Sequence, residues 1–180
     1  MFALWFLTPR LEVLAASKCL ARLETESLAR LGHRLECEVP ASWRDIMPHE
    51  LAREFAAKLH QHPEDAGWWN WYGVTLEAPR TLAVSVGFKG WPHEGKVQIG
   101  YSVAREFRGQ GLATEAVGAL CGWAFRQGAL CIGADVAPEN LASRRVLEKC
   151  GFVLHSQRHD AHTGCDWLHF ERIAARHEAI

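Results

Sequence analysis

The sequence predicts an α+β domain in which a mixed sheet of about seven strands carries helices on both faces. Two of the strands, at 82–88 and 97–103, have apolar residues at every second position. A stretch with helical spacing of apolar residues then leads to a short apolar strand at 131–136. This strand–helix–strand order predicts a parallel pair joined by a right-handed crossover. The chain has 180 residues, of which 48% are hydrophobic, so we expect a single domain over residues 1–180 with its own core.

The first part of the chain predicts an extended segment followed by two helices. Residues 4–14 form an expected extended stretch that is broken near Thr8-Pro9-Arg10. Because proline removes a hydrogen-bond donor, we expect an edge strand or a bent strand there. Ser17 is expected to cap a helix that ends at Gly32. Pro48 is expected to begin the second helix.

The remaining strands predict a meander and a closing hairpin. A strand at 68–76 precedes the two alternating strands named above, and the short turns between them favour an antiparallel order. A helix over 140–150 leads into the last two strands, at 152–157 and 165–172, with a turn at 160–164.

Composition limits the class of protein. A formal net charge of −1 gives no general attraction to nucleic acid or to an anionic membrane. Six cysteines lack any Cys-x-x-Cys spacing and ten histidines form no recognisable ligand set, so we expect reduced thiols and no metal site. The apolar N-terminus lacks a basic segment and is too short to span a bilayer. We therefore expect a cytoplasmic protein without nucleic-acid or membrane partners.

A glycine turn marks the expected functional site. Arg108, Gly109, Gln110 and Gly111 follow the strand at 97–103 and stand directly before a helix. Glycines let the backbone turn tightly and approach a ligand, and the first amides of a helix have no acceptor within it. A strand, a glycine turn and a helix N-terminus in this order suit a phosphate or pyrophosphate.

Two motifs together resemble the GCN5-related N-acetyltransferases, the GNAT superfamily, in the branch similar to the ribosomal-protein N-acetyltransferases. The first is Arg108-x-x-Gly111-x-Ala113, and the second is the segment from Asn140 to Phe152. The resemblance covers roughly Thr81 to Arg172. It implies an acyl-coenzyme A N-acyltransferase fold and acetyl-coenzyme A as co-substrate, without a metal.

The resemblance also implies which residues bind the cofactor. The turn and the helix start would hold the pyrophosphate, the strand at 97–103 would offer backbone groups to the pantetheine arm, and Asn140 would contact that arm, although it can equally be a helix cap. The expected cofactor-binding residues are Tyr101, Val103, Arg108, Gly109, Gln110, Gly111, Leu112, Ala113, Thr114, Asn140 and Ser143.

Two candidate catalytic residues follow. Many relatives carry a tyrosine seven residues after the asparagine to protonate the departing thiolate, but that position is Leu147 here. Relatives of the ribosomal-protein branch have a serine where Ser143 stands, so Ser143 is expected to donate a hydrogen bond to the thiolate, or else to be only a local capping group.

Position 98, frequently glutamate in relatives, is Gln98, which cannot act as a base. Asp135, on a short apolar strand, is then the first candidate for the proton acceptor. His93 and Glu94 in the loop before the strand at 97–103, and Asp160 in the final hairpin, are the other candidates, and each of the four can instead be a solvated surface residue.

These observations predict an N-acetyltransferase that moves an acetyl group from acetyl-coenzyme A to a primary amine by direct attack. The acceptor is a protein N-terminus or an amine-bearing small molecule. The alternative is a non-catalytic acyl-coenzyme A binding or protein-interaction module on the same fold, which Leu147 and Gln98 keep open. The oligomeric state, with a homodimer among the options, stays open.

Overall fold

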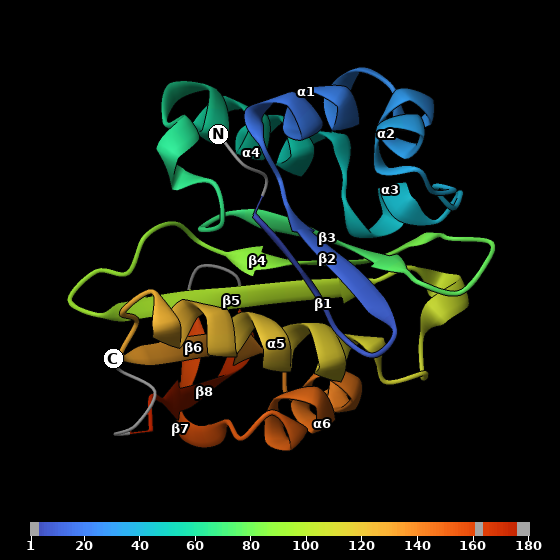
Figure 1. Cartoon of the computed structure of the whole chain (residues 1–180). Coiled ribbons are helices and arrows are strands. Elements are labelled where there is room, and N and C mark those ends of the chain that lie inside the picture. The colour runs from blue at the N-terminus through green and yellow to red at the C-terminus, as the bar shows by residue number, and fades with distance from the viewer. Residues whose placement is uncertain (1–3, 161–163, 176–180) are drawn as a thin grey trace.

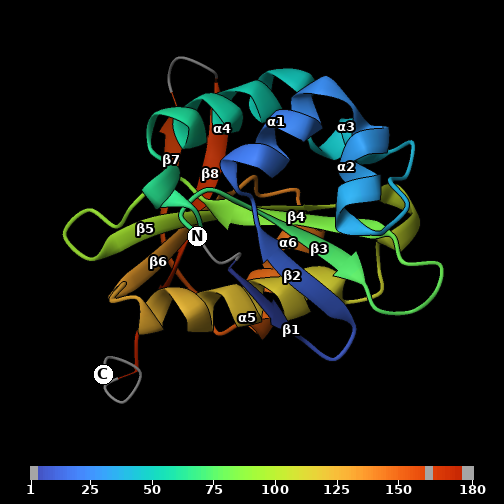
Figure 2. The same ribbon diagram turned by 45° about the horizontal axis from the view of Figure 1, so that its top comes forward.

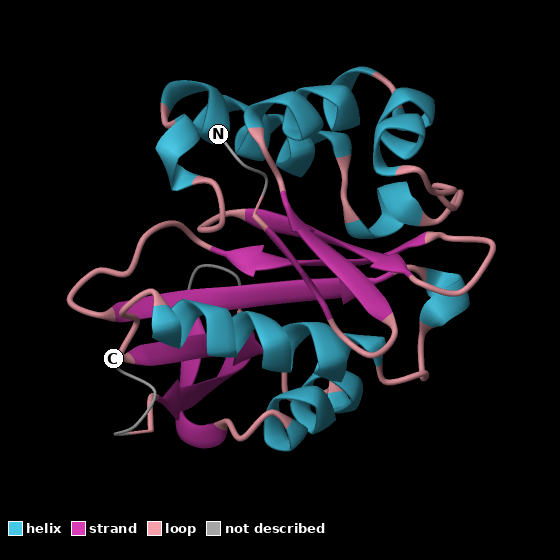
Figure 3. Cartoon of the chain, in the orientation of Figure 1, coloured by secondary structure: helices cyan, strands magenta, loops and turns pink. Residues whose placement is uncertain are grey.

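An eight-stranded mixed sheet runs through the molecule in the order β1-β2-β3-β4-β5-β6-β8-β7 (Figures 1 and 3). The computed structural model describes residues 4–160 and 164–175, so the middle of the expected turn at 160–164 lies outside the described residues. The strands are β1 (Trp5–Leu7), β2 (Leu11–Ala15), β3 (Asn70–Thr75), β4 (Leu82–Phe88), β5 (Lys96–Val103), β6 (Cys131–Val136), β7 (Val153–Asp160) and β8 (Cys165–Ile173). The predicted α+β architecture is confirmed.

The additional strand comes from the N-terminus, where the structure has the expected break near Pro9 but the chain reverses there instead of bending. Strands β1 and β2 form an antiparallel hairpin, with Trp5 opposite Leu14. The Thr8 hydroxyl accepts a hydrogen bond from the Leu11 amide at 3.0 Å, and the Thr8 amide donates to the Leu11 carbonyl at 2.8 Å. These two bonds close the turn around Pro9, so the chain reverses there.

Helices α1 to α4 gather on one face of the sheet (Figure 1). They are α1 (Lys18–Glu26), α2 (Leu28–Leu35), α3 (Trp43–Ile46) and α4 (His49–Gln61), and the 3-10 turn η1 (Pro63–Asp65) follows them. Ser17 caps α1 and Pro48 precedes α4, as predicted.

The predicted helix from Ser17 to Gly32 is in fact two helices. The Ser27 amide donates to the Leu23 carbonyl and ends α1, while the Ser27 hydroxyl accepts from the Arg30 amide at 3.4 Å and starts α2. Gly32 lies inside α2, which ends at Glu36 in the left-handed conformation. The apolar spacing continues across Ser27, so the pattern alone did not show the break.

The opposite face of the sheet carries α5 (Leu112–Arg126), which leads to α6 (Leu141–Lys149) after β6. A second 3-10 turn, η2 (Arg105–Phe107), precedes the glycine turn. Strand alternation divides the core: Trp71 packs on the α5 side and Tyr72 on the side of α1 to α4. No helix within the described residues has the length and apolarity needed to cross a membrane.

Strands β5 and β6, which precede and follow α5 in the chain, separate from each other along part of their length. Strand β4 pairs with β5 over a long register that reaches Val84 opposite Val103. Strands β5 and β6 run parallel, as predicted, but their register ends at Gln98 opposite Gly133. The rest of β5 therefore has no registered partner on β6, and this separation positions the functional site.

Candidate functional site

The turn before α5 presents backbone amides without side-chain caps. Gly109 and Gly111 have φ angles of 76° and 80°, a region that favours glycine. Gly111 stands at the N-cap of α5, where no side chain of the described residues caps the helix. The first amides of α5 therefore have no acceptor within the helix and lie at the positive end of its dipole.

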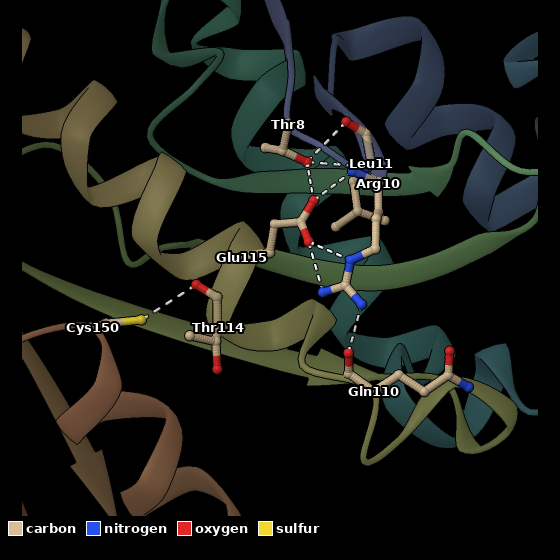
Figure 4. A network of polar contacts seen from close by, with 7 residues as sticks. All are labelled: Thr8, Arg10, Leu11, Gln110, Thr114, Glu115 and Cys150. Carbon is tan, nitrogen blue, oxygen red and sulfur yellow. Dashed lines mark hydrogen bonds and ion pairs between the residues drawn. The ribbon is translucent and has the colours of Figure 1, made fainter.

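The N-terminal hairpin holds this turn in place, a contact that Figure 4 shows from close by. The Arg10 guanidinium donates to the Gln110 carbonyl at 2.7 Å and pairs with the Glu115 carboxylate at 2.7 Å. The other Glu115 oxygen accepts from the Thr8 hydroxyl at 2.6 Å and from the Arg10 amide at 2.7 Å. One arginine thus links β2, the glycine turn and the first turn of α5.

The Glu115 carboxylate keeps its charge in this position. Burial by itself would raise its pKa, but the hydrogen bonds from Thr8 and Arg10 and the charge of Arg10 outweigh that effect and lower the pKa. The ion pair therefore persists into mildly acidic solution.

A cavity of about 610 Å³ opens beside the glycine turn. Its walls are the unpaired end of β5, the start of α5 and one side of α6. The lining residues are Tyr101, Ser102, Val103, Phe107, Arg108, Gly109, Gly111, Leu112, Ala113, Thr114, Asn140, Ala142, Ser143, Arg145, Val146 and Lys149. Every residue predicted to bind the cofactor lines this cavity except Gln110, whose side-chain amide turns back to the Glu106 carbonyl at 3.1 Å.

Two cationic residues of the lining were missed by the sequence reasoning. Arg145 and Lys149 lie four residues apart on α6 and share a face with the apolar Val146 and Ala142. With a helix starting after Asn140, their i, i+4 spacing in the sequence would have predicted that both lie on one face of that helix. Together with Arg108 they give the cavity a cationic rim.

A hydrogen bond between the Tyr101 side chain and the backbone of Ser143 joins β5 to α6 across the cavity. The Tyr101 hydroxyl donates to the Ser143 carbonyl at 3.0 Å, and burial raises the pKa of this phenol to about 12. Asn140 caps α6, because its side-chain oxygen accepts from the Ser143 amide at 3.1 Å. Leu147 is buried in the core.

The other face of the parted strands carries a polar group that we call the Asp135 cluster. It consists of Gln98, Asp135, Arg158, His169 and Glu171. The Asp135 carboxylate accepts from His169 Nδ1 at 2.7 Å, from Arg158 at 3.1 Å and from the Gln98 amide at 3.2 Å. His169 Nε2 lies 3.4 Å from a Glu171 oxygen.

The electrostatics of the Asp135 cluster favour the carboxylate form. Burial would raise the pKa of Asp135, but the hydrogen bond from His169 and the nearby charges of Arg158, His169 and Lys89 lower it overall. An ionised carboxylate only accepts hydrogen bonds, so His169 Nδ1 must carry the hydrogen that faces it. Among residues 4–160 and 164–175, no group of histidine, cysteine and acidic side chains is arranged to hold a metal ion.

Comparison with known proteins identifies the family. Residues 19–153 match the family model described as an acetyltransferase (GNAT) domain. YjdG of Bacillus subtilis (strain 168), described as an uncharacterised N-acetyltransferase, is 34% identical over 138 residues, which cover 75% of this chain and 79% of YjdG. This chain therefore belongs to the GNAT acetyltransferase family.

Solved structures have the same fold. A GNAT-family acetyltransferase from Bacillus anthracis superposes with a TM-score of 0.67 at 18% identity, covering 94% of this chain and 98% of that one. The ribosomal-protein-S5-alanine acetyltransferase from Vibrio fischeri gives 0.65 at 20% identity, with 94% and 96% covered.

The family assigns the activity class: this protein is an acetyl-coenzyme A dependent acyltransferase. The residues present fit that co-substrate. Uncapped amides at the start of α5, the cationic rim and room at Gly109, where an added Cβ would meet no atom within 4 Å, suit a diphosphate.

Proposed function

We propose that this protein transfers the acetyl group of acetyl-coenzyme A to a primary amine, on a protein N-terminus or a small molecule, by direct attack. The observation that carries the proposal is the continuity of the cavity. It extends from the glycine turn before α5 to Tyr101 on the part of β5 that β6 leaves unpaired. A phosphate-binding turn and an open strand edge thus belong to one site.

The chain's own residues divide the work of binding. We assign the diphosphate to the backbone amides from Gly109 to Thr114, with Gln110 contributing through its amide alone. Arg108, Arg145 and Lys149 supply cationic side chains at the rim. The edge of β5 that β6 leaves unpaired, between Ile99 and Val103, would pair with the pantetheine arm, although the Val103 carbonyl already accepts from Arg108 at 3.2 Å. Bound acetyl-coenzyme A supplies an activated thioester.

At the thioester end, we assign Ser143 as the hydrogen-bond donor to the departing thiolate. Its position in the first turn of α6 brings it into the cavity beside Tyr101. A β5 amide between Ile99 and Tyr101 would donate to the thioester oxygen, where negative charge gathers during attack. Direct attack requires no covalent acyl-enzyme, because the thioester and the amine would meet where β5 and β6 separate.

At the amine end, we place Asp135 among the residues that serve the acceptor. It lies on β6 just past the last β5–β6 pair. A carboxylate with a lowered pKa is a weak proton acceptor, so its contribution is charge and orientation.

The acceptor class is a primary amine. Structures with this fold include one named as acting on the alanine of ribosomal protein S5 and a chimera built on a spermidine N-acetyltransferase. An α-amine, with a pKa of about 8, loses its proton more readily than a lysine at about 10.4. We therefore favour protein N-termini or small amines of similar basicity.

The direct test measures free thiol released from acetyl-coenzyme A. The protein is incubated with a panel of peptides with free N-termini, lysine and polyamines. We expect thiol release with at least one amine, and Ser143→Ala lowering kcat about tenfold or more while acetyl-coenzyme A affinity is kept. Tight coenzyme A binding without turnover on any amine would support the non-catalytic module. Unchanged kcat in Ser143→Ala would remove that residue's role.

A further inference from the structure

Direct attack requires that the amine lose a proton, and the residues already assigned leave that step without an acceptor. Gln98 has no titratable group, and Asp135 is surrounded by donors that stabilise its anion. Within the Asp135 cluster, the imidazole of His169 has a second ring nitrogen, Nε2, whose lone pair can accept a proton when Nδ1 donates to Asp135.

The contacts of His169 fix its tautomer. Nδ1 donates to Asp135 at 2.7 Å, so in the neutral ring the lone pair lies on Nε2. Glu171 is 3.4 Å from Nε2, too long for a firm hydrogen bond but close enough to attract a proton gained there. A carboxylate that holds a histidine in one tautomer while its other nitrogen takes a proton is a known catalytic arrangement.

We propose that His169 is the general base for the acceptor amine and that Asp135 and Glu171 position it and stabilise its protonated form. This inference rests on the proposed function and assigns a role within it that the sequence reasoning did not give to His169.

The location of His169 agrees with this role. It pairs with Asp135 across β6 and β8, and its ring covers Gly133, where an added Cβ would come within 2.9 Å of the imidazole. Gly133 forms the last pair with β5, opposite Gln98, so the imidazole stands where the strands begin to part. Gly100 lies two residues after Gln98 on β5, and a Cβ added there would have no atom within 4 Å. An amine can thus approach beside Gly100.

The proton balance is simple. An N–H bond of the ammonium breaks and its proton binds Nε2 of His169, directly or through water. The freed lone pair forms the C–N bond to the acetyl carbon, and the C–S bond breaks with its electron pair on sulfur. The second amine proton goes to that sulfur, and His169 returns its proton to solvent.

Charged and titratable side chains near His169 come from four parts of the chain: β6, β7, β8 and the loop after β4. Asp135 lies on β6 and Glu171 on β8, and Arg158 and His155 extend from β7. Lys89, in the loop after β4, donates to the Gln98 side chain at 2.8 Å. His155 provides a matched control, because its Nδ1 lies 3.5 Å from Glu171 and its ring centroid 6.2 Å from that of His169. Unlike His169, His155 makes no hydrogen bond to Asp135 among the contacts of the described residues.

The test compares the kcat–pH profiles of the wild type, His169→Gln, Asp135→Asn and His155→Gln, with whichever peptide or amine the thiol-release panel selects. Acetyl-coenzyme A affinity and melting temperature are measured alongside. We expect His169→Gln to lower kcat about 100-fold near neutral pH. The ascending limb of its profile should move to alkaline pH, where the amine deprotonates without help. Asp135→Asn should also lower kcat and move the ascending limb to alkaline pH. The kcat–pH profile of His155→Gln should match that of the wild type.

A wild-type profile in His169→Gln would overturn the assignment while leaving the proposed function in place. If His169→Gln does not fold, Asp135→Asn decides, since it keeps the size of the side chain but removes the carboxylate that holds the His169 tautomer. A wild-type kcat–pH profile in Asp135→Asn would then overturn the assignment. Equal losses in His155→Gln and His169→Gln would also overturn it, because a general effect of charge on this face would then be responsible. No thiol release by the wild type with any amine would remove the proposed function and this inference with it.

Discussion

Glu24 carries a carboxyl group into the core between α1, α3 and β3. Its side chain is 1% exposed, and its two oxygens accept from Trp43 Nε1 and from the Tyr72 hydroxyl, each at 2.8 Å. Burial raises the pKa of Glu24, and the bonds from Trp43 and Tyr72 offset only part of that effect. The residue is therefore a structural acceptor that is less stable when ionised.

This burial predicts a specific dependence of stability on pH. Because the folded pKa lies above the unfolded one, the folded state binds more protons, and stability falls as pH rises from about 4.5 through the raised value. Glu24→Gln should remove this slope, because glutamine does not ionise. Urea unfolding between about pH 5 and pH 8 measures it.

The matched variant is Glu24→Ala. It leaves the Trp43 and Tyr72 donors buried without an acceptor, so we expect a loss of about 2–4 kcal/mol at every pH. A slope in Glu24→Gln equal to that of the wild type would show that another group causes the dependence.

At the scale of elements, the β1–β2 hairpin forms part of the cofactor site although it contributes nothing to the cavity wall. Arg10 binds the carbonyl of the turn that presents the amides and the acid of the helix that follows it. Figures 1 and 2 show the hairpin turn reaching the same end of α5. The hairpin therefore acts on the glycine turn by holding its backbone.

We predict that Arg10→Ala weakens acetyl-coenzyme A binding about three- to tenfold with little change in kcat at saturation. The effect is modest because the Arg10 side chain is 51% exposed. The affinity of Arg10→Lys should lie between those of the wild type and Arg10→Ala. A lysine ammonium can pair with Glu115, but it lacks the planar guanidinium that also donates to the Gln110 carbonyl. Isothermal titration with coenzyme A measures the affinity.

Arg22→Ala is the control for a general loss of charge. Arg22 is exposed and pairs with Glu26 on α1, away from the cavity. A loss of affinity in Arg22→Ala as large as that in Arg10→Ala would contradict the positioning role.

At the scale of the whole molecule, the sequence predicted what depends on local spacing. The alternation at 82–88 and 97–103, the crossover helix and the glycine turn are local signals, and the structure confirms each element. The hairpin at Pro9 depends in part on Glu115, more than 100 residues away, so local spacing predicted a break at Pro9 but not the reversal of the chain. His169 is one histidine among ten. What distinguishes it is the β6–β8 register that sets it opposite Asp135.

The cavity joins elements that are distant in the chain, so coenzyme A should stabilise the whole fold. A ligand at about 100 times its dissociation constant adds about 2.7 kcal/mol to the folded state, and a chain of this size gains about 2–4 °C for each kcal/mol. We expect the melting temperature to rise by about 5–10 °C with saturating coenzyme A.

Two glycine variants test where that stabilisation arises. Gly111 and Gly128 stand at the two ends of α5 with φ angles of 80° and 93°, so Gly111→Leu and Gly128→Leu introduce similar backbone strain, about 1–2 kcal/mol each. Only Gly111→Leu places a side chain beside the amides that we assign to the diphosphate. The rise in melting temperature on adding coenzyme A should therefore vanish in Gly111→Leu and persist in Gly128→Leu. A full rise in Gly111→Leu would place the coenzyme elsewhere, because the proposed diphosphate is held by the amides next to residue 111, which stands at the N-cap of α5.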